Sequence, residues 1–293
     1  YQSMTSNTTG TQNAAFGNAS LDANTTGNYN TAIGWGALSS NTTADNNTAV
    51  GQVALLDNTT GTNNAAFGRN SLTNNTTGSP NTAVGANAMS ANTTGNSCTA
   101  VGYLALDSCN ASENTAVGID ALGACTTGNS NTAVGADCSE FLTTGGSNTA
   151  IGHDCNRYGN GNYNTAVGRR ALLGVSGSTT GIKNVAVGYD ALMAITTGGE
   201  NTAVGMYAGD NTTTGANVTS VGYNAKPSSA TTNNEVILGN ANVGAVRAGP
   251  GGVTTLSDGR DKTDVVDIPD GLDFVDSLRP VSYTHLTLPT MRT

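Results

Sequence analysis

The chain has 293 residues, of which 39 are glycine, 5% are aromatic and 11% are charged. An ordinary globular domain has about 25% charged residues, so the composition argues against a typical globular enzyme. The chain has 11 Lys and Arg against 20 Asp and Glu, a net charge of −9. We therefore expect no nucleic-acid partner, because few basic side chains are available to neutralise phosphates.

The first residues, Tyr1-Gln2-Ser3-Met4, show no basic segment followed by an apolar one. We therefore expect no signal peptide, and the start has the character of an internal fragment. No apolar run approaches the roughly 18 residues that span a bilayer, so we also expect no membrane insertion.

A repeat dominates the chain from residue 13 onward. The pentad Asn-Thr-Ala-Val-Gly, or a close variant, recurs mostly every 17 residues, with two steps of 16 and one of 20. We number each copy from the pentad glycine as position 0. These fourteen glycines are Gly17, Gly34, Gly51, Gly68, Gly85, Gly102, Gly118, Gly135, Gly152, Gly168, Gly188, Gly205, Gly222 and Gly239.

The copies agree column by column. Position −2 is Ala in 12 of 14 copies, position −4 is Asn in 11, and position −1 is β-branched or larger and apolar. Position +4 is usually Leu or Met, and a turn such as Asn-Thr-Thr-Gly follows. Short β-branched segments between Gly and Asn predict short strands joined by tight turns. Residues 1–239 are therefore predicted to form an all-β fold, a repetitive parallel β-solenoid of about 14 coils stacked about 4.8 Å apart.

The strand faces predict an oligomer. Within the pentad, Asn, Ala and Gly point one way and Thr and Val the other, so both faces carry apolar groups. One face fills the coil and the other needs a partner surface. We expect Val and Leu inside, the Ala-Gly face packed on neighbouring chains, and a parallel homotrimer as the closed form.

An acidic column marks the best candidate metal ligands. Asp120, Asp137 and Asp154 stand at position +2 of consecutive copies. Stacked like charges repel, so the column is either a solvated edge that discourages aggregation or a weak Ca²⁺ or Mg²⁺ site. No other metal and no cofactor are expected.

The five cysteines replace small residues in stacked columns. Cys138 and Cys155 stand at position +3, Cys109 and Cys125 at position +7, and Cys98 at position −4. They are small apolar fillers or partners in disulfides between adjacent coils. Zinc is disfavoured because no Cys-x-x-Cys pair is present.

Rings recur at position +1 in Trp35, Tyr103, Tyr189 and Tyr223, with His153 between them. They are surface anchors or a stripe that stacks on sugar rings of a host glycan. Ice binding by the Thr column is a further alternative, although each pentad offers one Thr beside Val. The carboxylates are mostly isolated and His153 has no arranged nucleophile, so we expect no catalysis in the rod.

The pattern stops at residue 240. Residues 240–256 are rich in Gly and Val and form a predicted linker. Composition then changes at Ser257-Asp258-Gly259-Arg260-Asp261-Lys262, and residues 270–278 have the spacing of a short amphipathic helix.

Residues 257–283 resemble the start of a known domain. The string Ser-Asp-x-Arg-x-Lys, followed by Gly-Leu-x-Phe and Leu-Arg-Pro-Val-Ser-Tyr, is similar to the intramolecular chaperone domain (S74 peptidase) of phage tail fibres and tailspikes. The resemblance implies a trimeric fibre, with self-cleavage between Ser257 and Asp258, Ser257 as nucleophile and Lys262 as its base. Residues 284–293 do not resemble the family, which leaves the chaperone incomplete. Ordinary loop residues at a domain boundary are the alternative for Ser257 and Lys262.

The repeats are similar to those of tail fibres and of trimeric-adhesin heads. The expectation is therefore a phage tail-fibre protein of the virion that binds a host glycan or protein receptor. A bacterial trimeric surface adhesin is the alternative, and the only enzymatic activity expected is self-cleavage.

Overall fold

The computed structural model describes residues 2–244. The described residues contain fourteen strands and no helix. The strands are β1 (Ala14–Phe16), β2 (Thr31–Ile33), β3 (Thr48–Val50), β4 (Ala65–Phe67), β5 (Thr82–Val84), β6 (Thr99–Val101), β7 (Thr115–Val117), β8 (Thr132–Val134), β9 (Thr149–Ile151), β10 (Thr165–Val167), β11 (Val185–Val187), β12 (Thr202–Val204), β13 (Thr219–Val221) and β14 (Val236–Leu238). The part of the chain that the structure describes contains no candidate membrane-spanning helix.

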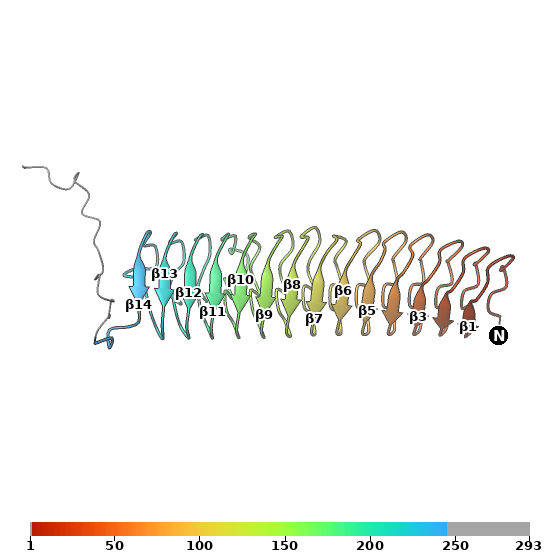
Figure 1. Cartoon of the computed structure of the whole chain (residues 1–293), viewed down its shortest axis with the longest axis horizontal. Coiled ribbons are helices and arrows are strands. Elements are labelled where there is room, and N and C mark those ends of the chain that lie inside the picture. The colour runs from red at the N-terminus through yellow and green to blue at the C-terminus, as the bar shows by residue number, and fades with distance from the viewer. Residues whose placement is uncertain (1, 245–293) are drawn as a thin grey trace, which may run out of the picture. The chain divides into compact units, whose positions relative to one another are not determined.

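All fourteen strands belong to one parallel sheet in sequence order, one strand per coil (Figure 1). Each repeat pairs with the next without slippage, so Ala15 lies opposite Ala32 and Ala32 opposite Ala49. The register holds across the 20-residue step, where Ala166 pairs with Ala186. The predicted β-solenoid is confirmed, because equivalent side chains of successive repeats form continuous columns.

The interior contains alanine and leucine. The Ala at position −2 and the Leu or Met at position +4 are fully buried in most coils, as in Ala49 and Leu55. The prediction of Leu inside is correct, but that of Val inside and Ala outside is wrong. The Val at position −1 points outward and is 36–40% exposed in Val101 and Val204. A single coil is too thin for two layers of branched side chains, so the small Ala faces inward.

Backbone handedness explains how adjacent residues share the interior. Ala37 and Leu38 are neighbours, yet both are fully buried. Leu38 has a φ of 52° and Gly36 has a φ of 67°, so left-handed residues alternate with right-handed ones around this corner. In a regular strand, successive side chains point to opposite faces. The alternating backbone handedness at this corner removes that pattern, so that two adjacent side chains both point into the interior. Left-handed non-glycine residues recur at positions −5, +2 and +4 of the repeat.

Two buried asparagine columns hold the coils in register. At position −4, the Asn Oδ1 accepts the backbone N–H of the next copy, as between Asn30 and Asn47 at 3.0 Å. The Nδ2 of Asn47 donates to the turn carbonyl of Gly61 at 2.9 Å. At position +7, Asn58 Nδ2 donates to Asn41 Oδ1 at 3.0 Å, and Asn75 Nδ2 donates to Asn58 Oδ1 at 2.8 Å. Each amide therefore satisfies buried polar groups of its own coil and a neighbouring one.

The glycine column is a point of backbone contact between coils. Gly135 has a φ of 140°, and a Cβ there would lie 2.4 Å from the carbonyl oxygen of Gly152. The same close approach recurs from coil to coil. Glycine at position 0 is therefore required by both conformation and space.

Candidate functional site

The outward face of the sheet carries a continuous apolar column, which we call the apolar stripe. It comprises the position −1 residues Phe16, Ile33, Val50, Phe67, Val84, Val101, Val117, Val134, Ile151, Val167, Val187, Val204, Val221 and Leu238. Nine of them are large exposed hydrophobics, and Phe16 is 78% exposed. The position −3 residues, mostly Thr, share this face and are half-buried in most coils, so the face is a mixed Thr and Val array. Contiguous exposed apolar surface of this kind marks an interaction site.

The acidic column is only partly brought together as expected. Ligand atoms of Asp137, His153 and Asp154 lie within 4.8 Å of one another, and Asp120 is outside that group. Both carboxylate oxygens of Asp154 are engaged, one by His153 Nδ1 at 2.8 Å and the other by Arg157 Nη1 at 2.7 Å. The protein itself therefore supplies positive charge to Asp154. Burial raises the pKa of Asp120, and the charges of Asp137 and Asp107 raise it further.

All five cysteines are buried free thiols, which fits small apolar fillers. Cys109 and Cys125 are stacked on adjacent coils with their Sγ atoms 3.0 Å apart. The hydrogen bond to Cys125, together with burial, raises the pKa of Cys109. Burial raises the pKa of Cys98 to about 11. Because their pKa values are raised, Cys98 and Cys109 are poor nucleophiles and poor metal ligands at neutral pH.

The rings at position +1 do not form one continuous stripe. Trp35 and Tyr103 are half-exposed and are separated along their column by non-aromatic residues. Tyr189, Tyr207 and Tyr223 make edge contacts, with centroids 5.5 and 6.3 Å apart, and the Arg169 guanidinium lies 5.6 Å from the Tyr189 centroid. Tyr207 comes from position +2, so the structure assembles a tyrosine cluster that the position +1 column does not predict.

A separate aromatic pair, Phe141 and Tyr158, was not predicted from the sequence. Phe141 and Tyr158 occupy position +6 of consecutive coils, where other copies have small or polar residues such as Ala, Ser and Asn. Their rings stack with centroids 5.2 Å apart and planes at 3°. The Arg157 guanidinium lies 5.5 and 5.8 Å from the two centroids, and its Nη2 pairs with Glu140 at 2.6 Å. The sequence does carry a signal for this pair, because two bulky aromatic residues replace the small or polar residues of the position +6 column.

Two cavities flank this pair. One, of about 290 Å³, is lined by Phe141, Tyr158 and six polar or glycine residues, Thr143, Asn160, Ser176, Gly177, Thr179 and Thr180; we call it the aromatic cavity. The other, of about 210 Å³, shares Phe141 and includes the carboxylates of Asp107, Asp120 and Glu140. A π-face beside hydroxyl and amide groups is the chemistry of a small polar ligand site.

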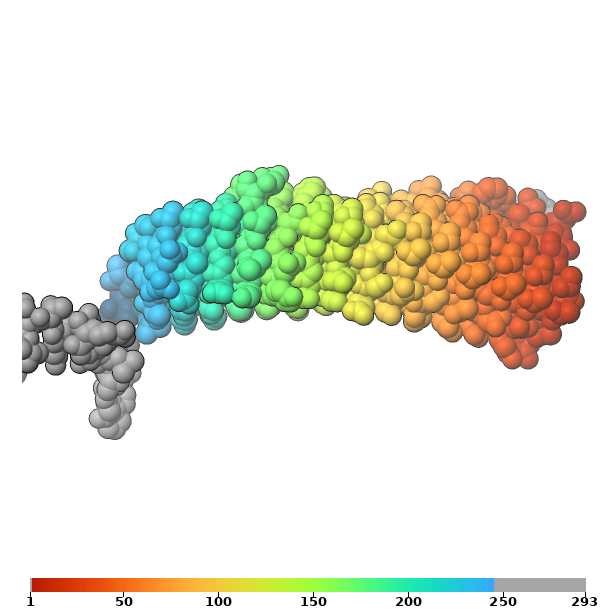
Figure 2. All heavy atoms as spheres, turned by 90° about the horizontal axis from the view of Figure 1, so that it is seen from above, coloured from red at the N-terminus to blue at the C-terminus, as the bar shows by residue number. Residues whose placement is uncertain are grey.

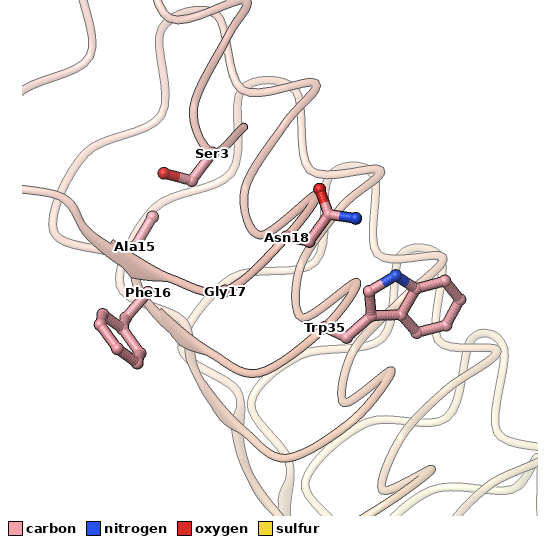
Figure 3. Close-up of a pocket in the computed structure, with 6 residues that line it drawn as sticks. All are labelled: Ser3, Ala15, Phe16, Gly17, Asn18 and Trp35. Atoms are coloured by element: carbon pink, nitrogen blue, oxygen red, sulfur yellow. The ribbon is translucent and has the colours of Figure 1, made fainter. Parts of the chain in front are cut away.

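A further cavity of about 540 Å³ lies at the first coil and is lined by Ser3, Ala15, Phe16, Gly17, Asn18 and Trp35. Figure 3 shows the Phe16 and Trp35 rings extending in different directions from the backbone, so they do not form the two walls of an aromatic cleft.

The expected self-cleavage residues Ser257, Asp258 and Lys262 lie outside the described residues, as do the predicted helix at 270–278, the tail at 284–293 and most of the linker at 240–256. Comparison with known proteins finds no matching family profile, curated protein or solved structure. The candidate sites of the described residues are the apolar stripe and the aromatic cavity.

Proposed function

We propose that this chain is a phage tail-fibre protein, a structural and receptor-binding rod that works as a homotrimer and attaches the virion to its host. The observation that carries the proposal is the apolar stripe, which follows the sheet from β1 to β14. Exposed Val, Ile and Phe side chains on a protein of net charge −9 favour association through this one face.

The repeat explains why identical parallel chains suit the stripe. Every coil presents the same small set of side chains at the same spacing, so a parallel copy offers its own stripe in matching register. Copies related by rotation about an axis parallel to the rod form a closed assembly. The stripe takes the partner role that the sequence had suggested for the Ala-Gly face, because Ala is buried inside each coil. The number three rests on the resemblance of residues 257–283 to the chaperone of trimeric fibres.

The presence of several copies of the same binding feature supports a role in host attachment. A rod of three chains presents three copies of any receptor-binding feature, so weak contacts to a host glycan or protein add by avidity. The chaperone-like segment extends the proposal to one self-cleavage event between Ser257 and Asp258. In that step the Ser257 hydroxyl of one chain attacks the carbonyl of the Ser257–Asp258 bond in a neighbouring chain of the trimer, and Lys262 accepts its proton. The C–N bond then breaks, the proton passes to the Asp258 amine as it leaves, and water hydrolyses the resulting ester to a free carboxylate.

Light scattering after size exclusion tests the assembly. The wild-type chain should elute at the mass of a trimer, and Val101→Lys with Val134→Lys should reduce it to a monomer. The control pair, Thr59→Lys with Thr76→Lys, changes turn residues outside the stripe and should remain trimeric. A monomeric wild-type chain, or a double stripe variant that stays trimeric, would refute the proposed interface.

Immunogold labelling tests the biological setting. Antibody against the rod should label tail fibres of purified virions, whereas labelling of a bacterial surface would favour a trimeric adhesin. Expression of the complete gene should give a fragment ending at Ser257 on a denaturing gel, and Ser257→Ala should abolish it.

A further inference from the structure

We infer that the aromatic cavity is a binding site for one uncharged pyranose ring of a surface glycan. This inference rests on the proposed attachment function and gives it a ligand class and a location. The cavity lies where the repeat departs most from its consensus, in the coils that contain β8, β9 and β10.

The floor of the site is a fixed aromatic surface. Phe141 and Tyr158 stack nearly parallel, and Arg157 spans both rings while its two terminal nitrogens pair with Glu140 and Asp154. The guanidinium therefore holds the ring pair in place. At the same column position the next coil has Gly174, so no side chain continues the stack beyond Tyr158.

The wall of the site is a loop that occurs once in the rod. The 20-residue step is three residues longer than the repeat and carries the segment 175–178 after Gly174. Figure 2 shows a green segment that protrudes from the upper edge of the rod in this region. Thr179, which is 3% exposed, holds the loop in place through hydrogen bonds to the Val175 backbone. Its hydroxyl accepts from the Val175 N–H at 2.7 Å and lies 3.1 Å from the Val175 carbonyl. Ser178 N–H also donates to Val175 at 3.0 Å. The wall is thus preformed, which lowers the entropic cost of binding.

The polar rim is neutral. None of the residues that line the cavity carries a charge. Thr143 and Asn160 are joined by a 2.8 Å hydrogen bond, while Ser176 and Thr180 add exposed hydroxyls. An aromatic face suits the C–H face of a pyranose, and the hydroxyls of Ser176 and Thr180 suit its hydroxyls. The Asn160 Oδ1 already accepts from the backbone N–H groups of Thr143, Thr144 and Gly145, which fixes this side of the cavity. The volume of about 290 Å³ is at the low end of the range for ligand pockets, about 300–1,000 Å³, which fits one ring.

The charge around the site selects against acidic sugars. The neighbouring cavity beyond Phe141 contains Asp107, Asp120 and Glu140. A sialic or uronic acid would place its carboxylate near these groups, and the positive charge of Arg157 is already paired. The ligand class is therefore neutral pyranosides such as hexosides.

Saturation-transfer NMR and calorimetry on the full chain test the site. The probes are methyl glucoside, methyl galactoside and methyl mannoside, with methyl glucuronide and a methyl sialoside as acidic comparators. We expect at least one neutral pyranoside to bind with a Kd of about millimolar, as suits so small a ligand, and the acidic comparators to bind at least tenfold more weakly.

Single-residue variants test whether the pyranoside binds in the aromatic cavity. Tyr158→Leu keeps bulk in the stack but removes the π-face and should weaken binding at least tenfold, whereas Tyr158→Phe should stay within twofold of wild type. Tyr29→Ala removes an exposed ring outside the cavity and is the matched control. Circular dichroism checks that each variant is folded. Absence of binding by every neutral probe, or equal binding by Tyr158→Leu, overturns the inference.

Cell binding by labelled trimer separates this inference from the proposed function. If cells bind wild type and Tyr158→Leu equally, the sugar site is wrong and attachment stands. If neutral sugars bind at Tyr158 but the rod binds no cells, the site stands and the attachment role is refuted.

Discussion

Replacing Gly135 with alanine probes the stacking contact on which the whole rod depends. Gly135 has a φ of 140°, and an added Cβ would lie 2.4 Å from the Gly152 carbonyl oxygen, where ordinary contact begins at 3.4 Å. The coils would have to separate by about 1 Å (3.4 − 2.4), which strains the 2.8 Å bond from Gly152 N–H to Val134. Backbone strain costs about 1–3 kcal/mol, and each loosened hydrogen bond costs about 0.5–1.5 kcal/mol. With this one bond loosened, we expect a loss of about 3 kcal/mol, the middle of the combined range.

Gly177→Ala is the matched control. Gly177 also has a positive φ, 73°, but a Cβ there would meet no atom within 4 Å. The left-handed conformation costs an alanine about 1–2 kcal/mol of stability. Alanine also lowers the conformational entropy of the unfolded chain, which offsets about 0.4–1 kcal/mol of that cost. Gly177→Ala should therefore change stability by about 1 kcal/mol or less.

The assay is urea denaturation followed by circular dichroism, with hydrogen exchange read by mass spectrometry, because repeat arrays can unfold in segments. Gly135→Ala should increase exchange in β8 and β9 first. The stacking argument would be refuted if the two alanine variants differed by less than 1 kcal/mol and exchange in β8 and β9 stayed at the wild-type rate.

Three further outcomes are expected. Asn58→Leu should cost about 1–3 kcal/mol in urea denaturation, because it leaves the buried Asn41 Oδ1 without its donor; a loss below 0.5 kcal/mol, on the order of a surface substitution, would contradict the ladder. Cys98, with a pKa of about 11, and the other buried thiols should react with a disulfide reagent at pH 8 only after denaturation, so fast labelling of the native chain would be inconsistent with their burial. Asp120→Asn should raise the urea midpoint slightly at pH 7, because burial and the charges of Asp137 and Asp107 raise the folded-state pKa of Asp120 above its ordinary value of 3.8. The stability that a raised pKa contributes is complete below the unfolded value and is lost as pH rises through the folded value, so the difference between the two chains should vanish below about pH 3.8; a difference that persists there would contradict this cause.

The sequence alone determined the repeat, the fold class and the register. Asn-Thr-Ala-Val-Gly at a near-constant spacing predicts one strand per copy, and Ala15 does pair with Ala32. This succeeded because a β-solenoid places each residue beside its own equivalent, so the period can be read directly from the chain.

Only the tertiary structure decided which side chains face inward. Adjacent residues of a regular strand point to opposite faces, yet Ala37 and Leu38 are both buried because Leu38 has a left-handed backbone. A local pattern does not reveal such a conformation, because leucine rarely adopts it and the surrounding coils impose it. The aromatic cavity arose in the same way: Phe141, Tyr158 and the loop at 175–178 come from successive coils, and only the stacking of those coils brings them together.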